Sequence, residues 1–192
     1  MKIDIGNWSI CSDNTSPMTP IVLEGEFDKD ELKTINILLD EIELTRFTDK
    51  DLNFKGGWVK YTDQTAWLYG RINKIFEYAN QAYKIPALVM IEEIAYLEYG
   101  ENDFQDWHAD LDMGIPFSSR KLAVCINISG SDDYRGGTVE FMTSNIPYPV
   151  RRAHGTAIIS PTYLLRKVDT VTKGTRKQLV AWISSPSVEE IC

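Results

Sequence analysis

Strict alternation of side chains in residues 121–129 is the feature that most constrains the fold of this chain. One face carries Leu122, Val124, Ile126 and Ile128, and the other carries Ala123, Cys125 and Asn127. Successive side chains of a β-strand point to opposite faces of the sheet, so this pattern predicts a strand. The fold must therefore contain a β-sheet around this segment.

Short apolar segments elsewhere predict further strands. They cover residues 94–99, 138–142, 156–160, 164–169 and 178–183, and a turn-rich link fills residues 130–137. Short strands separated by turns at this spacing are typical of a β-sandwich or jelly roll. The chain is expected to be mainly β with N-terminal helices, an α+β protein.

Two amphipathic helices are expected before these strands. The first covers residues 27–44, where Asp28 caps the helix and Glu31 completes a capping box three residues later. The second covers residues 65–83, with apolar residues at helical spacing, and Pro86 then stops helical structure. Both helices should pack on one sheet of the β-structure.

The segments around these helices are predicted to be irregular or at an edge. Residues 21–23 can start an edge strand, whereas residues 48–57, which contain a Gly-Gly pair, are read as a loop. A chain of 192 residues is long enough for one domain with a real core. We expect a single domain, with residues 1–90 as helical support and residues 91–185 as the jelly-roll core.

Composition excludes several classes of function. A net charge of −8 argues against nucleic-acid binding, which needs a basic surface. No apolar run reaches about 18 residues, so no membrane span is expected. Three cysteines, an odd number and far apart, are typical of free thiols in a reducing compartment, and the first residues lack the apolar run of a secretory signal. A cytoplasmic protein is expected; its oligomeric state is left open.

A His-x-Asp pair and a distant arginine are the candidate chemical groups. His108 and Asp110, two residues apart on a strand, would point to the same face and could bind a metal ion. An isolated pair of this kind occurs often by chance. Arg176 offers a planar fork that grips a carboxylate with two hydrogen bonds, although a surface arginine beside an acidic neighbour is the alternative.

The order of motifs from Trp107 to Trp182 is similar to a known family. Trp107-His-Ala-Asp110, Arg120-Lys-Leu122, Gly136-Gly137, Ser160-Pro161 and Gly174-Thr-Arg176 follow one another. The series resembles the catalytic half of the iron(II)/2-oxoglutarate-dependent oxygenases, in particular the prolyl-4-hydroxylase-like branch. The resemblance implies a double-stranded β-helix (jelly roll).

It also implies two cofactors, Fe(II) and 2-oxoglutarate. His108 and Asp110 would then be the catalytic iron ligands, and Arg176 would bind the 2-oxoglutarate carboxylate with Tyr99 as a hydroxyl partner.

One residue departs from the family pattern. The family's second, distal histidine lies about ten residues before the carboxylate-binding arginine, and Arg166 occupies that position here. A guanidinium group stays protonated and has no lone pair to give a metal ion. A slip of one residue would place Lys167 there, which is no better. Iron binding is therefore in doubt.

Several arrangements could follow from this substitution. His154 is the other histidine, but five or six extended residues span roughly 17–20 Å, which should put it at the wrong end of the barrel. Asp112 could join His108 and Asp110 if the strand stays regular, or two protein ligands could hold iron together with 2-oxoglutarate. Arg166 could instead form an ion pair with Asp110 in place of the metal.

Two functional hypotheses remain. The first is a 2-oxoglutarate-dependent dioxygenase that hydroxylates a peptidyl, prolyl-like or small-molecule substrate. The second is a catalytically impaired or inactive binding module of the same fold, in which Arg166 is paired with Asp110. The joint presence of His108, Asp110 and Arg176 indicates that the pocket still has a use.

Overall fold

The structure is a computed structural model that describes residues 4–5, 8–9, 19–90, 92–111, 119–150 and 153–185. Its helices are α1 (Lys29–Leu39) and α2 (Ala66–Tyr83). Its strands are β1 (Asp4–Ile5), β2 (Trp8–Ser9), β3 (Ile21–Leu23), β4 (Thr45–Thr48), β5 (Leu52–Val59), β6 (Ile94–Tyr99), β7 (Phe104–His108), β8 (Arg120–Asn127), β9 (Tyr134–Gly136), β10 (Val139–Phe141), β11 (Tyr148–Val150), β12 (Ala157–Pro161), β13 (Arg166–Val168), β14 (Val171–Gly174) and β15 (Arg176–Ser184).

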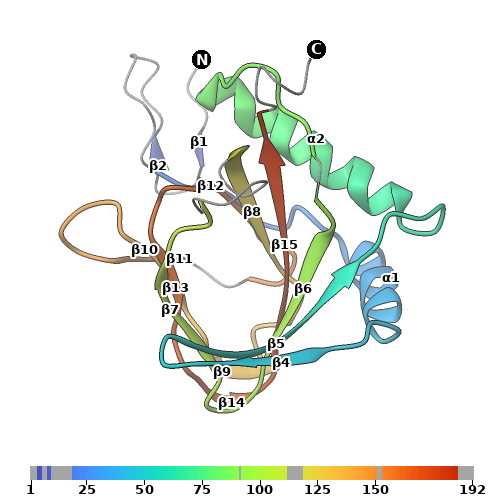
Figure 1. Ribbon diagram of the computed structural model, residues 1–192, viewed down its shortest axis with the longest axis vertical. Coiled ribbons are helices and arrows are strands. Elements are labelled where there is room, and N and C mark those ends of the chain that lie inside the picture. Colours follow the sequence, from blue (N-terminus) through green and yellow to red (C-terminus); the bar gives the residue numbers. More distant parts are fainter. Residues whose placement is uncertain are drawn as a thin grey trace.

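Antiparallel strands wrap around a common interior and form the predicted jelly roll (Figure 1). The main sheet runs in the order β11-β10-β13-β7-β5-β6-β15-β8-β12-β3, and β4 pairs with β5. Strand β5 pairs with β6 through Lys55–Val59 and with β7 through Leu52 and Asn53. Because one strand bonds to both neighbours along different parts of its length, it joins the two halves of the fold.

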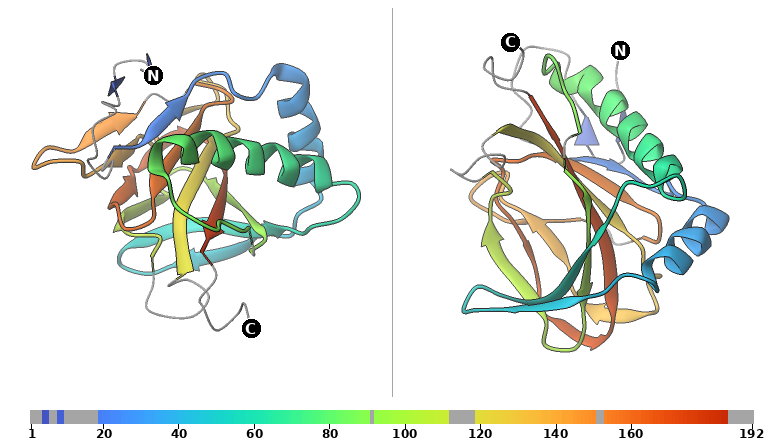
Figure 2. Two further views of the ribbon diagram at one scale, coloured as in Figure 1. Left: turned by 90° about the horizontal axis from the view of Figure 1, so that it is seen from above. Right: turned by 45° about the vertical axis from the view of Figure 1, so that its right-hand side comes forward.

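Strand β8 separates two apolar clusters, as its alternation predicts. Leu122, Val124, Ile126 and the following Ile128 pack in an outer cluster with residues of α1 and α2. Ala123 and Cys125 face an inner cluster between the two halves of the sheet. Figure 2 shows both helices on the outer side of the strands.

Both predicted helices are present, with one boundary corrected. Asp28 accepts hydrogen bonds from the backbone N–H groups of Asp30 and Glu31, and Glu31 bonds back to the Asp28 N–H, which confirms the capping box. The first helix ends at Leu39, not at residue 44 as predicted. Among the described residues, neither helix is long and apolar enough to cross a membrane.

The loop predicted for residues 48–57 is wrong, because these residues belong to the β4–β5 hairpin. Its Gly-Gly pair lies within β5. A Cβ atom on Gly57 would approach the Ile42 side chain to 2.6 Å and the Glu43 carbonyl oxygen to 2.7 Å. Glycine is therefore needed here so that the segment after α1 can cross the strand closely. This crossing also explains why the helix does not continue to residue 44.

A small two-stranded sheet holds the start of β15. Strand β9 lies within the predicted turn-rich link and pairs with β14. Gly174 ends β14 with a φ of +76°, and a Cβ atom there would lie 2.1 Å from the Asp133 carbonyl oxygen. Only glycine meets both requirements. This turn directs the chain into β15, whose first residue is Arg176.

Substitution of two glycines should change stability in opposite directions. Gly174→Ala introduces a side chain at positive φ against a backbone carbonyl, so we expect it to lower the free energy of unfolding by about 1–2 kcal/mol or more. Gly70→Ala, in the exposed interior of α2 with no atom within 4 Å of the new Cβ, should raise it by about 0.5–1 kcal/mol. Urea denaturation of both variants measures the difference. Equal effects would contradict this account of Gly174.

Candidate functional site

Four of the five side chains predicted for the site come from four strands, and the fifth, Asp110, comes from the segment after β7. His108 ends β7 opposite Arg166, the first residue of β13. Arg176, the first residue of β15, lies opposite Tyr99, the last residue of β6. Asp110 follows β7 by two residues and lies outside the strand, although the sequence predicted it within one. Two pairs of strand neighbours thus place four of the groups, and the ion pair of Asp110 with Arg166 places the fifth.

Arg166 and Asp110 form a buried, two-pronged ion pair. The Arg166 Nε atom donates to one Asp110 carboxylate oxygen at 2.8 Å, and Nη2 donates to the other at 2.9 Å. The side chains are only 2% and 8% exposed. Burial alone would raise the pKa of the Asp110 carboxyl, but the Arg166 guanidinium offsets burial and holds that pKa below its usual range. Both groups are therefore charged.

His108 is held as a neutral ring with one bare nitrogen. Its Nδ1 atom lies 2.8 Å from the Asp106 carbonyl oxygen, which can only accept, so Nδ1 carries the hydrogen. Its Nε2 atom is then an acceptor, and it is buried without a partner among the described residues. Burial, and then the charge of Arg166, lower the pKa of His108 to about 4.

An irregularity in β7 brings a further polar group to the interior. Val168 pairs with Gln105 and Arg166 pairs with His108, so two steps along β13 correspond to three along β7. Such a bulge changes which side chains share a face. Gln105 and His108 consequently lie on the same face, and the Gln105 Oε1 atom accepts the Tyr99 hydroxyl hydrogen at 2.9 Å.

Arg176 is a buried cation without a carboxylate partner in the described part of the chain. Its Nη1 atom donates to the Gln178 Oε1 atom at 2.6 Å, and its Cζ atom lies 5.7 Å from the centre of the Tyr99 ring. Gln178 also donates to the Tyr99 hydroxyl at 3.3 Å. The arginine is 2% exposed. A buried charge of this kind is costly unless an opposite charge compensates it.

Arg120 supports the loop that carries Asp110, a role that sequence reasoning missed. It forms an ion pair with Glu92 and donates to the Asp110 backbone carbonyl oxygen at 3.2 Å. Its Cζ atom also lies 3.8 Å from the centre of the Trp182 ring. The alternation in residues 121–129 predicted a strand directly after Arg120, but it does not reveal which acidic residue the arginine contacts.

The donor set does not fit iron(II). In the described residues, no group of three or more His, Cys, Asp or Glu side chains is arranged to hold a metal ion. Both Asp110 oxygens are bonded to Arg166, and Arg166 has no lone pair to offer. Of the described residues at the site, His108 alone offers a free metal-ligating atom, Nε2.

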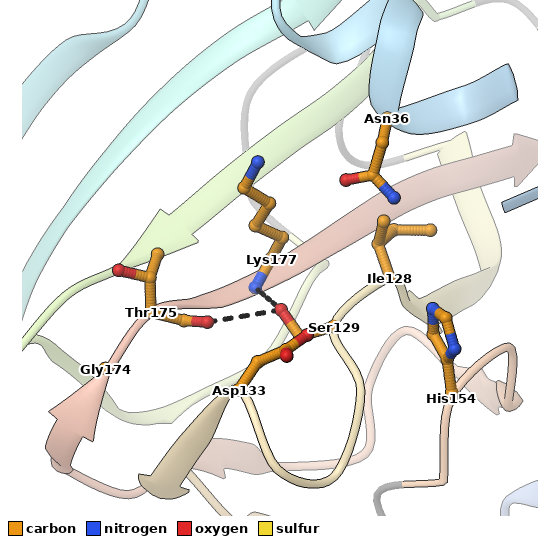
Figure 3. Close-up of a pocket in the computed structure, with 8 residues that line it drawn as sticks. All are labelled: Asn36, Ile128, Ser129, Asp133, His154, Gly174, Thr175 and Lys177. Atoms are coloured by element: carbon orange, nitrogen blue, oxygen red, sulfur yellow. Dashed lines mark hydrogen bonds between the residues drawn. The ribbon is translucent and has the colours of Figure 1, made fainter. Parts of the chain in front are cut away.

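Of the two substitutes considered from the sequence, His154 does not complete the set. Asp112 lies outside the described residues. Gly155, next to His154, donates to the Asn127 carbonyl oxygen, whereas Leu111 next to Asp110 bonds to Thr162 at the opposite end of β12. Figure 3 shows His154 in a separate pocket of about 510 Å³, lined by residues such as Ser129 and Lys177.

Several solved structures of similar fold are prolyl hydroxylases. A prolyl-4-hydroxylase of Pseudomonas putida is 12% identical, with 89% of this chain and 95% of that chain covered and a TM-score of 0.74. A collagen prolyl hydroxylase of Paramecium bursaria Chlorella virus-1, in complex with 2-oxoglutarate, is 16% identical, with 91% and 98% covered and a TM-score of 0.70. A prolyl hydroxylase of Trichoplax adhaerens, in complex with a hypoxia-inducible-factor peptide fragment, is 9% identical, with 88% and 84% covered and a TM-score of 0.71.

These similarities confirm the predicted fold. Another similar structure is described as a member of the 2OG-Fe(II) oxygenase family. No protein-family model and no curated protein matches the sequence. At these identities the likeness establishes the fold, and the chemistry has to be argued from the residues of this chain.

Removing one partner of the buried ion pair should destabilise the protein more than removing both. Asp110→Leu or Arg166→Met alone leaves an uncompensated buried charge, so each should cost roughly 3–5 kcal/mol. The double variant leaves neither charge of the pair and should lower the free energy of unfolding by less than either single change. Urea denaturation of the four proteins gives the coupling energy.

A partly exposed ion pair beside it serves as the control. Lys167, the next residue of β13, contacts Glu140 of β10 at 3.0 Å and Asp169 at 2.9 Å, so Glu140→Gln should cost less than about 1 kcal/mol. Additive effects of Asp110→Leu and Arg166→Met would contradict a coupled, buried pair.

Proposed function

We propose that this protein is a binding module built on the oxygenase fold, which takes an organic carboxylate at Arg176 without iron. The observation that carries the proposal is the ion pair between Arg166 and Asp110. It uses both oxygens of the one carboxylate that a metal would need. The site therefore differs from an iron site in its net charge and in the atoms that are free to act as ligands.

Energetics favour the ion pair over a metal ion. Iron could reach Asp110 only if Arg166 moved, and breaking a buried pair costs roughly 3–5 kcal/mol because a charge is left unpaired. The displaced guanidinium would also lie close to the metal and repel it. Two protein ligands, His108 and Asp110, would have to offset both costs.

Arg176 supplies the reason to expect a carboxylate ligand. Its described partners, Gln178 and the Tyr99 ring, are neutral. A carboxylate would compensate the buried charge, and guanidinium groups bind carboxylates with parallel hydrogen bonds. The viral collagen prolyl hydroxylase with the same fold was solved with 2-oxoglutarate, which has carboxylates at both ends.

One observation favours a second candidate, a 2-oxoglutarate-dependent dioxygenase. The His108 ring is oriented by the Asp106 carbonyl oxygen so that Nε2 is bare, which is how histidine ligands are commonly prepared for a metal. Iron, if bound, would supply oxidative chemistry, and Arg166 would have to leave Asp110 first. The substrate would then be peptidyl, prolyl-like or a small molecule.

Anaerobic iron(II) titration distinguishes the two candidates. We expect the unmodified protein to bind no iron in calorimetry, with or without 2-oxoglutarate. Arg166→His frees Asp110 and adds an imidazole, so this variant should gain iron binding. Lys167→His, one residue along on the outer face beside Trp107, is the matched control and should gain none. Tight iron binding by the unmodified protein would favour the dioxygenase.

Replacement of Arg176 should separate ligand binding from stability. Arg176→Met removes a buried charge and keeps the length of the side chain, so the ligand-free variant should be as stable as the parent protein or more so. Organic carboxylates should raise the melting temperature of the parent protein but not that of Arg176→Met. At a ligand concentration of one hundred times Kd, the parent should gain about 2.7 kcal/mol in free energy of unfolding. A large loss of stability in the ligand-free variant would instead indicate a structural role.

A further inference from the structure

Three buried nitrogen atoms at the site have no partner among the described residues. They are Nε2 of His108, Nη1 of Arg166 and Nε of Arg176. Buried polar atoms in proteins are nearly always hydrogen-bonded, so each such atom points to something that binds there. The two arginines are 2% exposed, and bulk water therefore does not satisfy them.

Two of these atoms belong to side chains that lie side by side. His108 and Arg166 are directly opposite each other in the β7–β13 pairing, and paired side chains on one face lie close together. The His108 Nε2 atom is an acceptor, because Nδ1 carries the hydrogen and a second proton would place a positive charge on a buried ring beside the Arg166 guanidinium. The Arg166 Nη1 atom is a donor. The interior thus presents one acceptor beside one donor.

A hydroxyl group matches this pair. It can donate its hydrogen to His108 Nε2 and accept the hydrogen of Arg166 Nη1 through a lone pair. A ketone or carboxylate oxygen only accepts and would place a lone pair against that of His108. An ammonium group only donates and would meet the Arg166 charge.

The net charge of the site limits the charge that the rest of the ligand can carry. Asp110 carries one negative charge, and Arg166 and Arg176 carry two positive charges, while the His108 ring is neutral. One positive charge is left, which a single carboxylate compensates. Arg176 lies beside the Tyr99 ring, and the Tyr99 hydroxyl bonds to Gln105, which shares a face of β7 with His108 opposite Arg166. Both guanidinium groups therefore face the same part of the interior.

We propose that this interior site binds a hydroxycarboxylic acid with one carboxylate. Its carboxylate bonds to Arg176, and its hydroxyl lies between the His108 Nε2 and Arg166 Nη1 atoms. This inference rests on the proposed metal-free binding function and names the ligand class of that same site. The preference for a hydroxyl over a keto group distinguishes the ligand from 2-oxoglutarate.

The test compares matched acids that differ in one functional group. Straight-chain acids with a hydroxyl on carbon 2, 3, 4 or 5 are titrated by calorimetry beside their oxo and unsubstituted counterparts, for example lactate, pyruvate and propionate. Buffers are freed of metal on a chelating resin, because EDTA is itself a carboxylate. At one chain position, we expect the hydroxy acid to bind about 10- to 100-fold more tightly than its two counterparts.

Variants of the two histidines assign the preference to the site. His108→Phe removes the acceptor and keeps a ring of similar size, so the hydroxy acid should fall to the affinity of the unsubstituted acid. His154→Phe, in the pocket of Figure 3, is the matched control and should leave the preference unchanged.

Failure of this inference and failure of the proposed function give different results. If hydroxy, oxo and unsubstituted acids bind equally and all lose affinity in Arg176→Met, water fills the space beside His108 and the hydroxyl inference is overturned. If none of the acids binds in a manner that depends on Arg176, the carboxylate-binding function itself is overturned. A hydroxyl preference that survives His108→Phe would also overturn the inference.

Discussion

The bidentate contact between Arg166 and Asp110 fixes the character of the whole interior. It joins β13 to the segment after β7, and it engages both oxygens of the carboxylate. Arg120 holds the same segment from the other side through the Asp110 backbone carbonyl oxygen. Every other polar group of the site must adapt to this pair, because a buried ion pair can be broken only at the cost of an unpaired charge.

The fold can contain such a polar interior because much of its apolar packing lies on the outer side of the sheet. The outer cluster combines both helices with one face of β6, β8, β12 and β15, and it contains most of the large aliphatic residues of the core. Along β15, Leu179 and Ile183 belong to that cluster, whereas Arg176 and Gln178 fall on the inner face. The period of two along one strand thus separates the residues that stabilise the fold from those that shape the site.

The sequence predicted what depends on local periodicity and missed what depends on close approach. The alternation in β8 and the capping box at Asp28 need only neighbouring residues, and both are confirmed. The motif order identified Arg166 as the residue at the distal ligand position, and an ion pair with Asp110 was one of several arrangements left open from the charges alone. Gly57 was misread, because its role depends on a crossing segment from another part of the chain. Gln105 reaches the interior through a bulge that no spacing rule reveals.

A histidine and an arginine at position 166 give the site different net charges, so ligands of different charge would balance them. With a neutral histidine there, Asp110 and Arg176 would cancel, and a ferrous ion would bring two positive charges that a dianionic co-substrate could match. With Arg166, the surplus is one positive charge, spread over groups that cannot give it up. Under the proposed function, the site then favours a ligand with one negative charge, and the bare His108 nitrogen accepts a hydrogen bond from it. On this reasoning, the residue at position 166 decides whether the same fold suits a metal ion or an organic acid.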